Sequence, residues 1–490
     1  MRLGVAGLLI IAMATVASLA NASPRERLAS RASISAHLTE TFFTPTQAGS
    51  AKVIYEPSKT SKSFSYRLSR WSWSGSRWQT IRTVTKKGVF RGRKSTAVET
   101  FFGGKPVKVG GYRLRLSFGR ASKQLSFVVT AAPLHPLPVE VAGITNAEMV
   151  SAGNAYTCAL ISDGTIECWG VNESGELGDG SYNHGHGGDE DYSPTPVQVS
   201  GITSATAVAA DEGHTCAVLS SGAVDCWGVD AVGQLGDGNS RNSATPVPVV
   251  GITDAVQVSA GGGTSCAVLS SGAVDCWGIN VSGELGDGAT EPYSSTPVQV
   301  VGITNAVQVS VGFMSACAVL SSGEVECWGD NTGGELGDGV KDHGHRAVDN
   351  FGDSSPTPVP VSGITSAVAV SAGFSNEPCA LLSDGTVECW GGNSWTLTPL
   401  TSVTNANALS VGGDHACVRL SSGGAECWGN NDSGQLGGGT TGFSSTPIPV
   451  ENLANVTSLS AGYDHSCAVE SSGSVICWGK DKEGQLGSGG

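Results

Sequence analysis

After its first 22 residues, the sequence lacks long hydrophobic segments, and it has no segment with the pattern of an amphipathic helix. After residue 22, no segment is apolar enough to cross a membrane. No stretch spaces its apolar residues three and four apart, as a helix with one buried face requires. These absences argue against a helical fold and against a membrane-spanning helix after residue 22. The strand-like alternation that remains predicts an all-β protein.

Cysteine is absent from residues 23–132, and Lys and Arg are scarce in residues 136–490. Residues 23–135 hold 21 Lys and Arg against 4 Asp and Glu, whereas residues 136–490 hold 6 against 39. The two parts carry net charges of +17 and −33, which with Arg2 give the formal charge of −15. This split predicts two domains that generate fields of opposite sign.

Common catalytic motifs are also missing. The sequence has no Gly-x-Ser-x-Gly elbow, no His-Glu-x-x-His and no phosphate-binding glycine loop with Lys-Ser/Thr. We therefore predict no catalytic residues, no cofactor and no enzymatic activity. The alternative is a hydrolase or lyase that acts on an extracellular polymer.

One phrase recurs seven times between residues 158 and 477: a cysteine, nine residues that include a turn with glycine, and then Cys-Trp-Gly. Successive Cys-Trp-Gly triplets are 58, 50, 51, 62, 38 and 50 residues apart. A period near 50 residues is typical of propeller blades and not of helical solenoids. The phrase uses all 14 cysteines, which pair as Cys158 with Cys168, Cys216 with Cys226, Cys266 with Cys276, Cys317 with Cys327, Cys379 with Cys389, Cys417 with Cys427, and Cys467 with Cys477.

Each repeat contains about four strand-like segments, so seven repeats predict a seven-bladed β-propeller. Most repeats carry Pro-Val-x-Val, but the chain ends without this segment after its last repeat. An extra copy, Pro138 to Val141, precedes the first repeat. We predict that it completes the last blade and closes the ring, which removes the open sheet edges.

The paired cysteines could be buried thiols, metal ligands or disulfides. Each pair flanks one hairpin turn, where opposed residues come within disulfide distance, whereas metal sites favour clustered C-x2-C pairs. We predict seven disulfides, one within each blade.

The first 22 residues predict a signal peptide. Arg2 is followed by an apolar run from Leu3 to Leu19 and by the small-x-small pattern Ala20-Asn21-Ala22, so we expect cleavage after Ala22. Residues 23–132 predict a basic β-sandwich of immunoglobulin-like or fibronectin-like type. Residues 133–137 are the predicted linker, and residues 138–490 are the predicted propeller.

The repeat, as in Ser259–Gly288, resembles the regulator of chromosome condensation repeat, and the resemblance covers residues 138–490. It implies a seven-bladed propeller. The family includes a nuclear guanine-nucleotide exchange factor as well as binding scaffolds, one of them a secreted bacterial inhibitor of β-lactamases. This sequence is most similar to the secreted type, because it adds a signal peptide, paired cysteines and an acidic ring. Exchange activity follows from family analogy only, and the fold is the property that transfers safely.

Blades one and four carry inserts at the same point of the repeat, residues 181–191 and 341–346, and each contains His-Gly-His beside carboxylates. These groups are ligands that Zn²⁺ or Cu²⁺ accepts, and long loops on a rigid ring are common binding sites. A flexible polar loop is the alternative. The predicted metal ligands are His184, His186, His343 and His345. The predicted partner contacts are Asp189, Glu190, Asp191, Asp342, Arg346 and Trp395.

Two further features of the repeats bear on function. His214, His415 and His465 each stand two residues before the first cysteine of their blades, so we interpret them as links between strands. Blade five lacks the Gly-Gln/Glu-Leu-Gly phrase, and its Trp395 either fills the vacated space or borders a notch for a partner.

Taken together, these patterns predict an exported, secreted or cell-surface protein that acts as a non-catalytic binding scaffold. The expected partner is a protein or an anionic cell-envelope polymer, and an inhibitor of an extracellular hydrolase is the sharpest form of this hypothesis. We expect no nucleic acid partner, because no recognition motif is present. The chain is expected to be monomeric.

Overall fold

A computed structural model describes residues 34–38, 42–43, 52–57, 61–72, 77–90, 94–97, 110–118, 121–129 and 134–489, apart from 185–190, 290, 347–351, 375–376, 393 and 401 in the last range. The predicted signal peptide and its cleavage site therefore lie outside the described residues. So do His186, Asp189 and Glu190, and the side chains of His345, Arg346 and Trp395. Every described element is a strand, and no helix long and apolar enough to span a membrane occurs in the described ranges.

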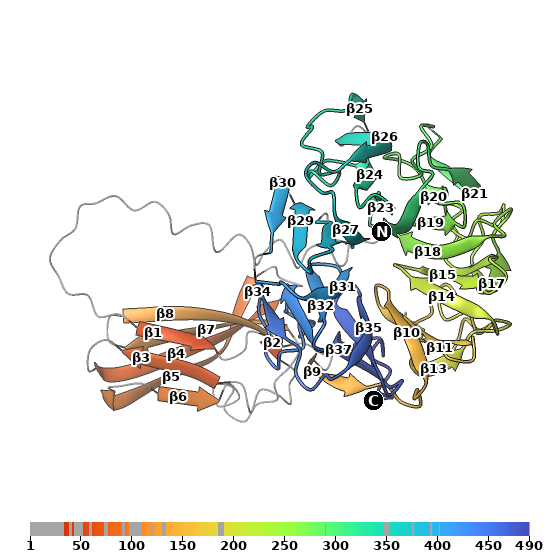
Figure 1. The fold of residues 1–490 in the computed structure, drawn as a ribbon. Helices are drawn as coiled ribbons and strands as arrows, with labels where there is room; N and C mark the ends of the chain where they lie inside the picture. The colour runs from red at the N-terminus through yellow and green to blue at the C-terminus, as the bar shows by residue number, and fades with distance from the viewer. Residues whose placement is uncertain are drawn as a thin grey trace. The chain divides into compact units, whose positions relative to one another are not determined.

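The strands before residue 130 form two sheets of their own (Figure 1), with the orders β1-β3-β6 and β2-β8-β7-β4-β5. Buried side chains alternate along the second sheet, with Tyr66 and Leu68 on β4 and Leu114 and Leu116 on β7. A small β domain therefore precedes the propeller, and its immunoglobulin-like or fibronectin-like type stays a prediction. The strands are β1 (Ile34–Leu38), β2 (Phe42–Phe43), β3 (Lys52–Pro57), β4 (Ser61–Ser72), β5 (Arg77–Phe90), β6 (Lys94–Ala97), β7 (Gly110–Phe118) and β8 (Ala121–Val129).

The remaining strands form seven antiparallel sheets arranged in a ring, which confirms the predicted seven-bladed propeller (Figure 1). Six blades have four strands, and blade four has a fifth, β25, contributed by its insert. Blades one to three are β10 (Ala147–Ala152), β11 (Tyr156–Ile161), β12 (Ile166–Val171) and β13 (Tyr192–Gln198); β14 (Ala205–Ala210), β15 (His214–Leu219), β16 (Val224–Gly228) and β17 (Ser243–Pro248); β18 (Ala255–Gly261), β19 (Thr264–Leu269), β20 (Val274–Ile279) and β21 (Tyr293–Gln299).

The other four blades follow the same order. They are β22 (Ala306–Val311), β23 (Ser315–Leu320), β24 (Val325–Asp330), β25 (His345–Arg346) and β26 (Asp353–Pro360); β27 (Ala367–Ser371), β28 (Cys379–Leu382), β29 (Val387–Gly391) and β30 (Ser394–Pro399); β31 (Ala406–Val411), β32 (His415–Leu420), β33 (Ala425–Gly429) and β34 (Ser444–Pro449); β35 (Val456–Ala461), β36 (His465–Glu470), β37 (Val475–Lys480) and β9 (Leu134–Glu140).

Strand β9 closes the ring as predicted. It pairs antiparallel with β37, the third strand of the last blade, and places Val139 opposite Cys477. The strand already begins at Leu134, so residues 134–137, which we expected to be a linker, are part of it. Prolines 136 and 138 favour this extended backbone, and an outermost strand tolerates them because it needs few ladder donors.

All fourteen cysteines form the seven predicted disulfides. In blade one, Cys158 and Cys168 stand directly opposite each other on β11 and β12, with their Cα atoms 4.1 Å apart. This spacing is close to that of a non-hydrogen-bonded antiparallel pair, so the hairpin itself brings the sulfurs together. Seven disulfides are typical of a protein from an oxidising compartment.

The hydrophobic core is divided among the junctions between blades. In the described part of the chain, seven hydrophobic clusters occur, and each combines residues of two neighbouring blades. At six junctions a tryptophan of one blade also donates its Nε1–H to a backbone carbonyl of the preceding blade, as Trp227 does to Glu176 over 2.9 Å. The other five pairs are Trp169 with Gln485, Trp277 with Gln234, Trp328 with Glu284, Trp390 with Glu335, and Trp478 with Gln435.

The carbonyl that accepts the indole hydrogen bond belongs to the Glu or Gln of the Gly-Glu/Gln-Leu-Gly phrase. The second glycine of the same phrase lies very close to the indole ring. Gly178 has a φ of +68°, and a Cβ atom there would stand 2.6 Å from Nε1 of Trp227. Blade five lacks the phrase, and Trp428 of blade six is accordingly only partly buried and has no such carbonyl partner among the described residues.

The Glu/Gln side chain of the phrase is itself buried. In each of the six blades its side-chain oxygen accepts a hydrogen bond from the backbone N–H two residues earlier, at 2.7 to 2.9 Å. Three blades use Gln, which is neutral, and three use Glu. Burial raises the pKa of Glu176, Glu284 and Glu335 to about 7 in each case. The site therefore favours a neutral group.

We expect Glu284→Gln to stabilise the propeller above neutral pH. The folded-state pKa of Glu284 lies above the unfolded value, so its contribution to stability is greatest below pH 4.5 and is lost as the pH rises towards about 7. Glutamine keeps the hydrogen bond to Ser282 N–H without a charge. Denaturant unfolding at pH 8 should show a gain on the order of 3 kcal/mol, and at pH 4 the variant and wild type should be nearly equal.

The chain supplies its own control. Gln435→Glu introduces a carboxyl at the equivalent position of blade six, and it should make stability fall more steeply between pH 4.5 and 8 than it does in wild type, which already carries three such carboxyls. Equal unfolding curves for wild type and Glu284→Gln at pH 8 would contradict the argument.

Candidate binding face

The antiparallel blades bring two kinds of connection to the same face of the ring. Because successive strands reverse direction, the connections after the first and third strands lie on one face, and those after the second and fourth lie on the other. We call the first of these the loop face. Both inserts belong to it, since they lie between β12 and β13 and between β24 and β26. The short connections that surround the central channel belong to it as well.

In the blade-four insert, His343 is held between two carboxylates. Its Nε2 lies 2.8 Å from Oδ2 of Asp338, and its Nδ1 lies 2.7 Å from Oδ2 of Asp353. The backbone N–H of His343 also donates to Asp353 Oδ1 at 2.6 Å. Asp338 follows the Gly-Glu-Leu-Gly turn and Asp353 begins β26, so the histidine links both ends of the insert.

Blade one repeats this arrangement with a different insert sequence. His184 Nε2 lies 2.8 Å from Asp179 Oδ2, and Nδ1 lies 3.0 Å from Asp191 Oδ2. The backbone N–H of His184 donates to Asp191 Oδ1 at 2.8 Å. We call these two groups the Asp-His-Asp clamps. Asp191, a predicted partner contact, is therefore engaged within its own loop, whereas Asp342 is exposed.

The clamps favour a charged imidazole. Burial disfavours the charge on His343, but hydrogen bonds to Asp353 and Asp338 outweigh it, so the pKa of His343 is raised above its ordinary value. The same causes raise the pKa of His184. Only the protonated ring donates from both nitrogens, so the clamp is complete when histidine is charged and both carboxylates are ionised.

The same residues bear on the metal prediction. Both ring nitrogens of His184 and of His343 are engaged with carboxylates, and no group of three or more potential metal ligands occurs in the described ranges. The second histidine of each insert, His186 or the side chain of His345, is not among the described residues. The metal site at these four histidines stays a prediction.

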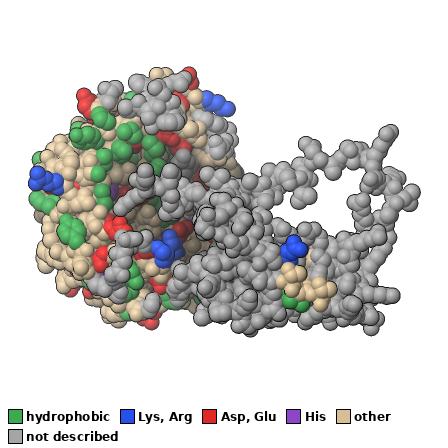
Figure 2. Space-filling model, turned by 180° about the vertical axis from the view of Figure 1, so that it is seen from behind, with side chains coloured by type: hydrophobic (Ala, Val, Ile, Leu, Met, Phe, Trp, Pro, Cys, Tyr) green, Lys and Arg blue, Asp and Glu red, His purple; other side chains and the backbone are tan. Residues whose placement is uncertain are grey.

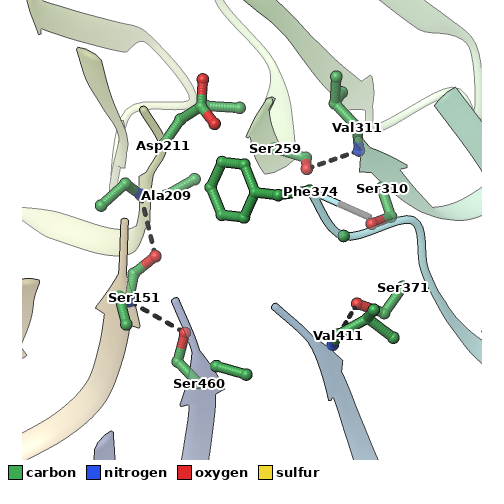
Figure 3. A pocket seen from close by; sticks show the side chains of 15 residues that line it. Ser151, Ala209, Asp211, Ser259, Ser310, Val311, Ser371, Phe374, Val411 and Ser460 are labelled. Carbon is green, nitrogen blue, oxygen red and sulfur yellow. Dashed lines mark hydrogen bonds between the residues drawn. The ribbon is translucent and has the colours of Figure 1, made fainter. Parts of the chain in front are cut away.

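The central channel opens in the middle of the ring. It forms a cavity of about 130 Å³ lined by the innermost strands. In six blades a serine on that strand accepts a hydrogen bond from a backbone N–H of the next blade, as Ser151 does from Ala210 at 2.9 Å. The others are Ser259, Ser310, Ser371, Ser410 and Ser460. Figure 3 shows the ring of Phe374 in the middle of this circle of serines.

Blade two departs from this pattern, with Ala209 in place of the serine and Asp211 in place of a glycine. Asp211 is fully buried, and burial raises its pKa to about 7. Its Oδ2 lies 3.5 Å from His214 Nδ1, and His214 Nε2 lies 2.8 Å from Ser265 Oγ. The order Asp-His-Ser is that of a hydrolase triad.

The recurrence of the histidine pair argues for a structural role here. His415 with Ser466 and His465 with Thr157 show the same contact, at 2.7 and 2.8 Å. Each hydroxyl donates in turn to a backbone carbonyl, as Ser265 does to Gln234, so its proton is already committed. All three histidines are buried, which lowers their pKa to about 4 for His214 and about 3 for the other two. These contacts confirm the predicted links between strands.

Aromatic side chains around the channel were not predicted from the sequence. Phe313, Phe374 and Tyr463 come from the connections after the first strands of blades four, five and seven. Phe313 and Tyr463 are 43% and 41% exposed, and the rings of Phe374 and Tyr463 meet edge to face with centroids 6.1 Å apart. The signal in the sequence is that this position varies between repeats, whereas the residue before it is glycine in six of the seven.

We expect the blade-four clamp to hold its insert more firmly at mildly acidic than at alkaline pH. The contribution of His343 is fully present below pH 6.5 and is lost as the pH rises through its raised pKa. Burial disfavours the charge on Asp353, but hydrogen bonds from the His343 backbone, Asn331 and the His343 ring together outweigh it and lower the pKa of Asp353, so its contribution is lost only in acid below its ordinary pKa. Hydrogen exchange of residues 338–346, corrected for intrinsic rates, should therefore be slower at pH 6 than at pH 9.

His343→Gln should remove most of this difference, with exchange at pH 6 about tenfold faster than in wild type, because glutamine cannot donate to both carboxylates. The connection of blade two, Asp237–Ser243, has no histidine and provides the internal control. The prediction fails if protection in the wild-type insert is the same at both pH values.

The comparisons with known proteins agree with this geometry. Two profiles described as Regulator of chromosome condensation (RCC1) repeat match residues 221–268 and 425–469, and residues 255–284, 407–435 and 456–485. Among relatives from Arabidopsis thaliana, the mitochondrial RCC1 domain-containing protein RUG3 is 32% identical over 133 residues, 27% of each chain. The Ultraviolet-B receptor UVR8 is 38% identical over 95 residues, 19% of this chain and 20% of its own. The chain thus matches only 20 to 27% of the length of these relatives.

Solved structures show the same fold. Human WBSCR16 is 18% identical with a TM-score of 0.59, and the likeness covers 85% of this chain and 99% of that one. Yeast RCC1 (Prp20), solved with Kap60 bound, is 17% identical with a TM-score of 0.56 over 73% of this chain and 91% of that one. The chain therefore carries regulator of chromosome condensation repeats, and they belong to a seven-bladed β-propeller.

Proposed function

We propose that this protein is an exported, non-catalytic scaffold that binds a protein partner on the loop face of its propeller. The observation that carries the proposal is the location of the residues that depart from the repeat. The recurring Cys, Trp, Gly and His residues build the ring, whereas both inserts and the channel aromatics lie on the loop face. Residues that serve no structural purpose in the repeat and share one face are candidates for recognition.

Two further observations support it. Seven disulfides fit a compartment outside the reducing cytosol. The similar yeast protein has been solved with a bound protein, Kap60, and a second structure of it, as Prp20p, concerns its binding to Gsp1p and histones. A protein partner is therefore the first choice here, and an extracellular hydrolase held in an inhibitory complex is the specific form that we favour.

The basic N-terminal part has a separate role in this proposal. Its 21 Lys and Arg against 4 Asp and Glu favour an anionic surface such as a cell-envelope polymer. Binding of this kind depends on salt, because exposed charges are screened over about 3 Å at 1 M ionic strength. The basic N-terminal part would anchor the chain to this surface, while the loop face of the propeller holds the partner.

The test is capture of partners from envelope extract and culture medium by the immobilised protein. We expect one protein to remain bound through a wash at about 1 M salt, and anionic polymer to be released by it. The matched variant replaces residues 181–192 and 341–352 by the four-residue connection Asn239–Asn242 of blade two. It should fold, keep the seven disulfides and lose the partner.

Two results would contradict the proposal. Retention of the same protein by the insert variant with undiminished affinity would remove the inserts from the binding site. Turnover of polysaccharide or peptide substrates by the wild-type chain, abolished by substitutions on the loop face, would show that the face is an active site and not a scaffold.

A further inference from the structure

The channel mouth, formed by Glu212, Phe374, Asp414, Tyr463 and Asp464, combines aromatic rings with carboxylates from several blades. Tyr463 and Phe374 are in edge-to-face contact, and Phe374 also lines the channel. Glu212 and Asp414 are exposed and Asp464 is partly exposed. Burial raises the pKa of the Tyr463 hydroxyl, and the charges of Asp414, Asp464 and Glu212 raise it further, so these carboxylates act on the same ring.

Backbone hydrogen bonds hold these residues in place. The N–H of Phe374 donates to Gly412 O at 3.0 Å, and that of Gly413 donates to Gly462 O at 3.0 Å. The N–H of Tyr463 donates to Gly153 O at 3.1 Å. Consecutive connections from blade five through blade seven to blade one are thus linked to one another. The mouth is therefore one connected surface and not a set of independent loops.

Within the described residues, the negative charge of the mouth is largely uncompensated. The ammonium of Lys480 lies 3.4 Å from Asp464, and it is the one cation in an ion pair with a mouth carboxylate among the described residues. Residues 136–490 hold only 6 Lys and Arg in all. On the propeller in Figure 2, blue side chains stand in small separate groups. The potential at the mouth is therefore negative, and it attracts cations.

Asp211 adds an independent observation below the mouth. Its side chain is fully buried at the wall of the channel, and its Oδ1 makes no hydrogen bond with any described residue. The channel around it is lined by small side chains such as Ser151, Ser259 and Ala209 (Figure 3). A narrow channel of about 130 Å³ has room for a single extended side chain and not for a folded element.

From these observations we propose that the channel mouth binds the side chain of a lysine or arginine presented by a protein partner. The cation would lie over the rings of Tyr463 and Phe374, within reach of the carboxylates of Asp414, Glu212 and Asp464. Aromatic faces attract ammonium and guanidinium groups, and nearby carboxylates strengthen the attraction. The proposal rests on the proposed function, because it assumes that the partner is a protein.

The test uses the intact protein and three small probes: N-acetyl-lysine methylamide, N-acetyl-arginine methylamide and N-acetyl-norleucine methylamide. Ligand-observed saturation-transfer NMR should detect binding of the two cationic probes and not of norleucine, which has a similar apolar stem without the charge. Tyr463→Ala and Phe374→Ala should each weaken the cationic probes about two- to fivefold. Asp414→Asn should weaken them up to about fivefold and make binding less sensitive to salt.

Matched controls lie elsewhere on the loop face. Tyr293→Ala removes an aromatic ring that is 51% exposed, and Glu291→Gln removes one exposed negative charge. Both should leave probe binding unchanged. Equal binding by mouth and control variants, or binding of norleucine as tight as that of lysine, would overturn the proposal. So would a carbodiimide cross-link from Asp414 or Asp464 to a lysine within residues 23–133 of the same chain, because the occupant would then be the protein's own basic part.

The outcome can be separated from that of the scaffold proposal. A partner captured through high salt and held equally well by Tyr463→Ala, Phe374→Ala and Asp414→Asn would leave the scaffold standing and refute the cation site. Loss of that partner in these variants, but not in Tyr293→Ala or Glu291→Gln, would support both.

Discussion

The indole N–H that reaches a carbonyl of the preceding blade is the contact on which the rest of the ring depends. It fixes the turn of the Gly-Glu/Gln-Leu-Gly phrase, because the carbonyl of Glu176 and the close approach of Gly178 to Trp227 belong to the same few residues. This turn also fixes where the connection to the fourth strand of the blade begins. Each insert therefore leaves the blade from a rigid point, and Asp179 and Asp338 stand directly beside it, where a histidine of the insert can reach them.

Blade five shows what happens when this contact is absent. Its shortened connection lacks the Gly-Glu/Gln-Leu-Gly phrase. Trp428 of the next blade is only partly buried, whereas the tryptophans of the other six Cys-Trp-Gly triplets are buried. The hydrophobic cluster around Val403 and Val418 still joins blades five and six. The junction therefore relies on packing and on backbone hydrogen bonds such as that from the Val411 N–H to Ser371, without the indole contact. The side chain of Trp395, which either fills the vacated space or borders a notch, lies outside the described residues.

The repeat made the fold predictable, and the departures from it made the site hard to predict. Blade number, disulfide pairing and closure by Pro138 to Val141 follow from residues that recur at one register. The clamp around His343 could not be found in this way, because Asp338 and Asp353 are joined to it by the path of one irregular loop. Imidazoles beside carboxylates predicted a metal, and the structure shows that the same groups can bind each other directly. The contact between Phe374 and Tyr463 joins loops of two blades, which no local pattern reveals.

Recurrence is also what separates function from structure at the buried centre of the ring. Asp211, His214 and Ser265 alone would suggest a hydrolytic triad. The two histidine pairs in other blades show that the His-hydroxyl contact serves to join blades, and only Asp211 is unique. A residue that departs from the repeat and keeps an unpaired oxygen is costly for folding, so its retention calls for a compensating interaction. The cation that we propose over the rings of Tyr463 and Phe374 would supply part of that interaction, because its positive charge would act on the carboxylate of Asp211 in the channel below.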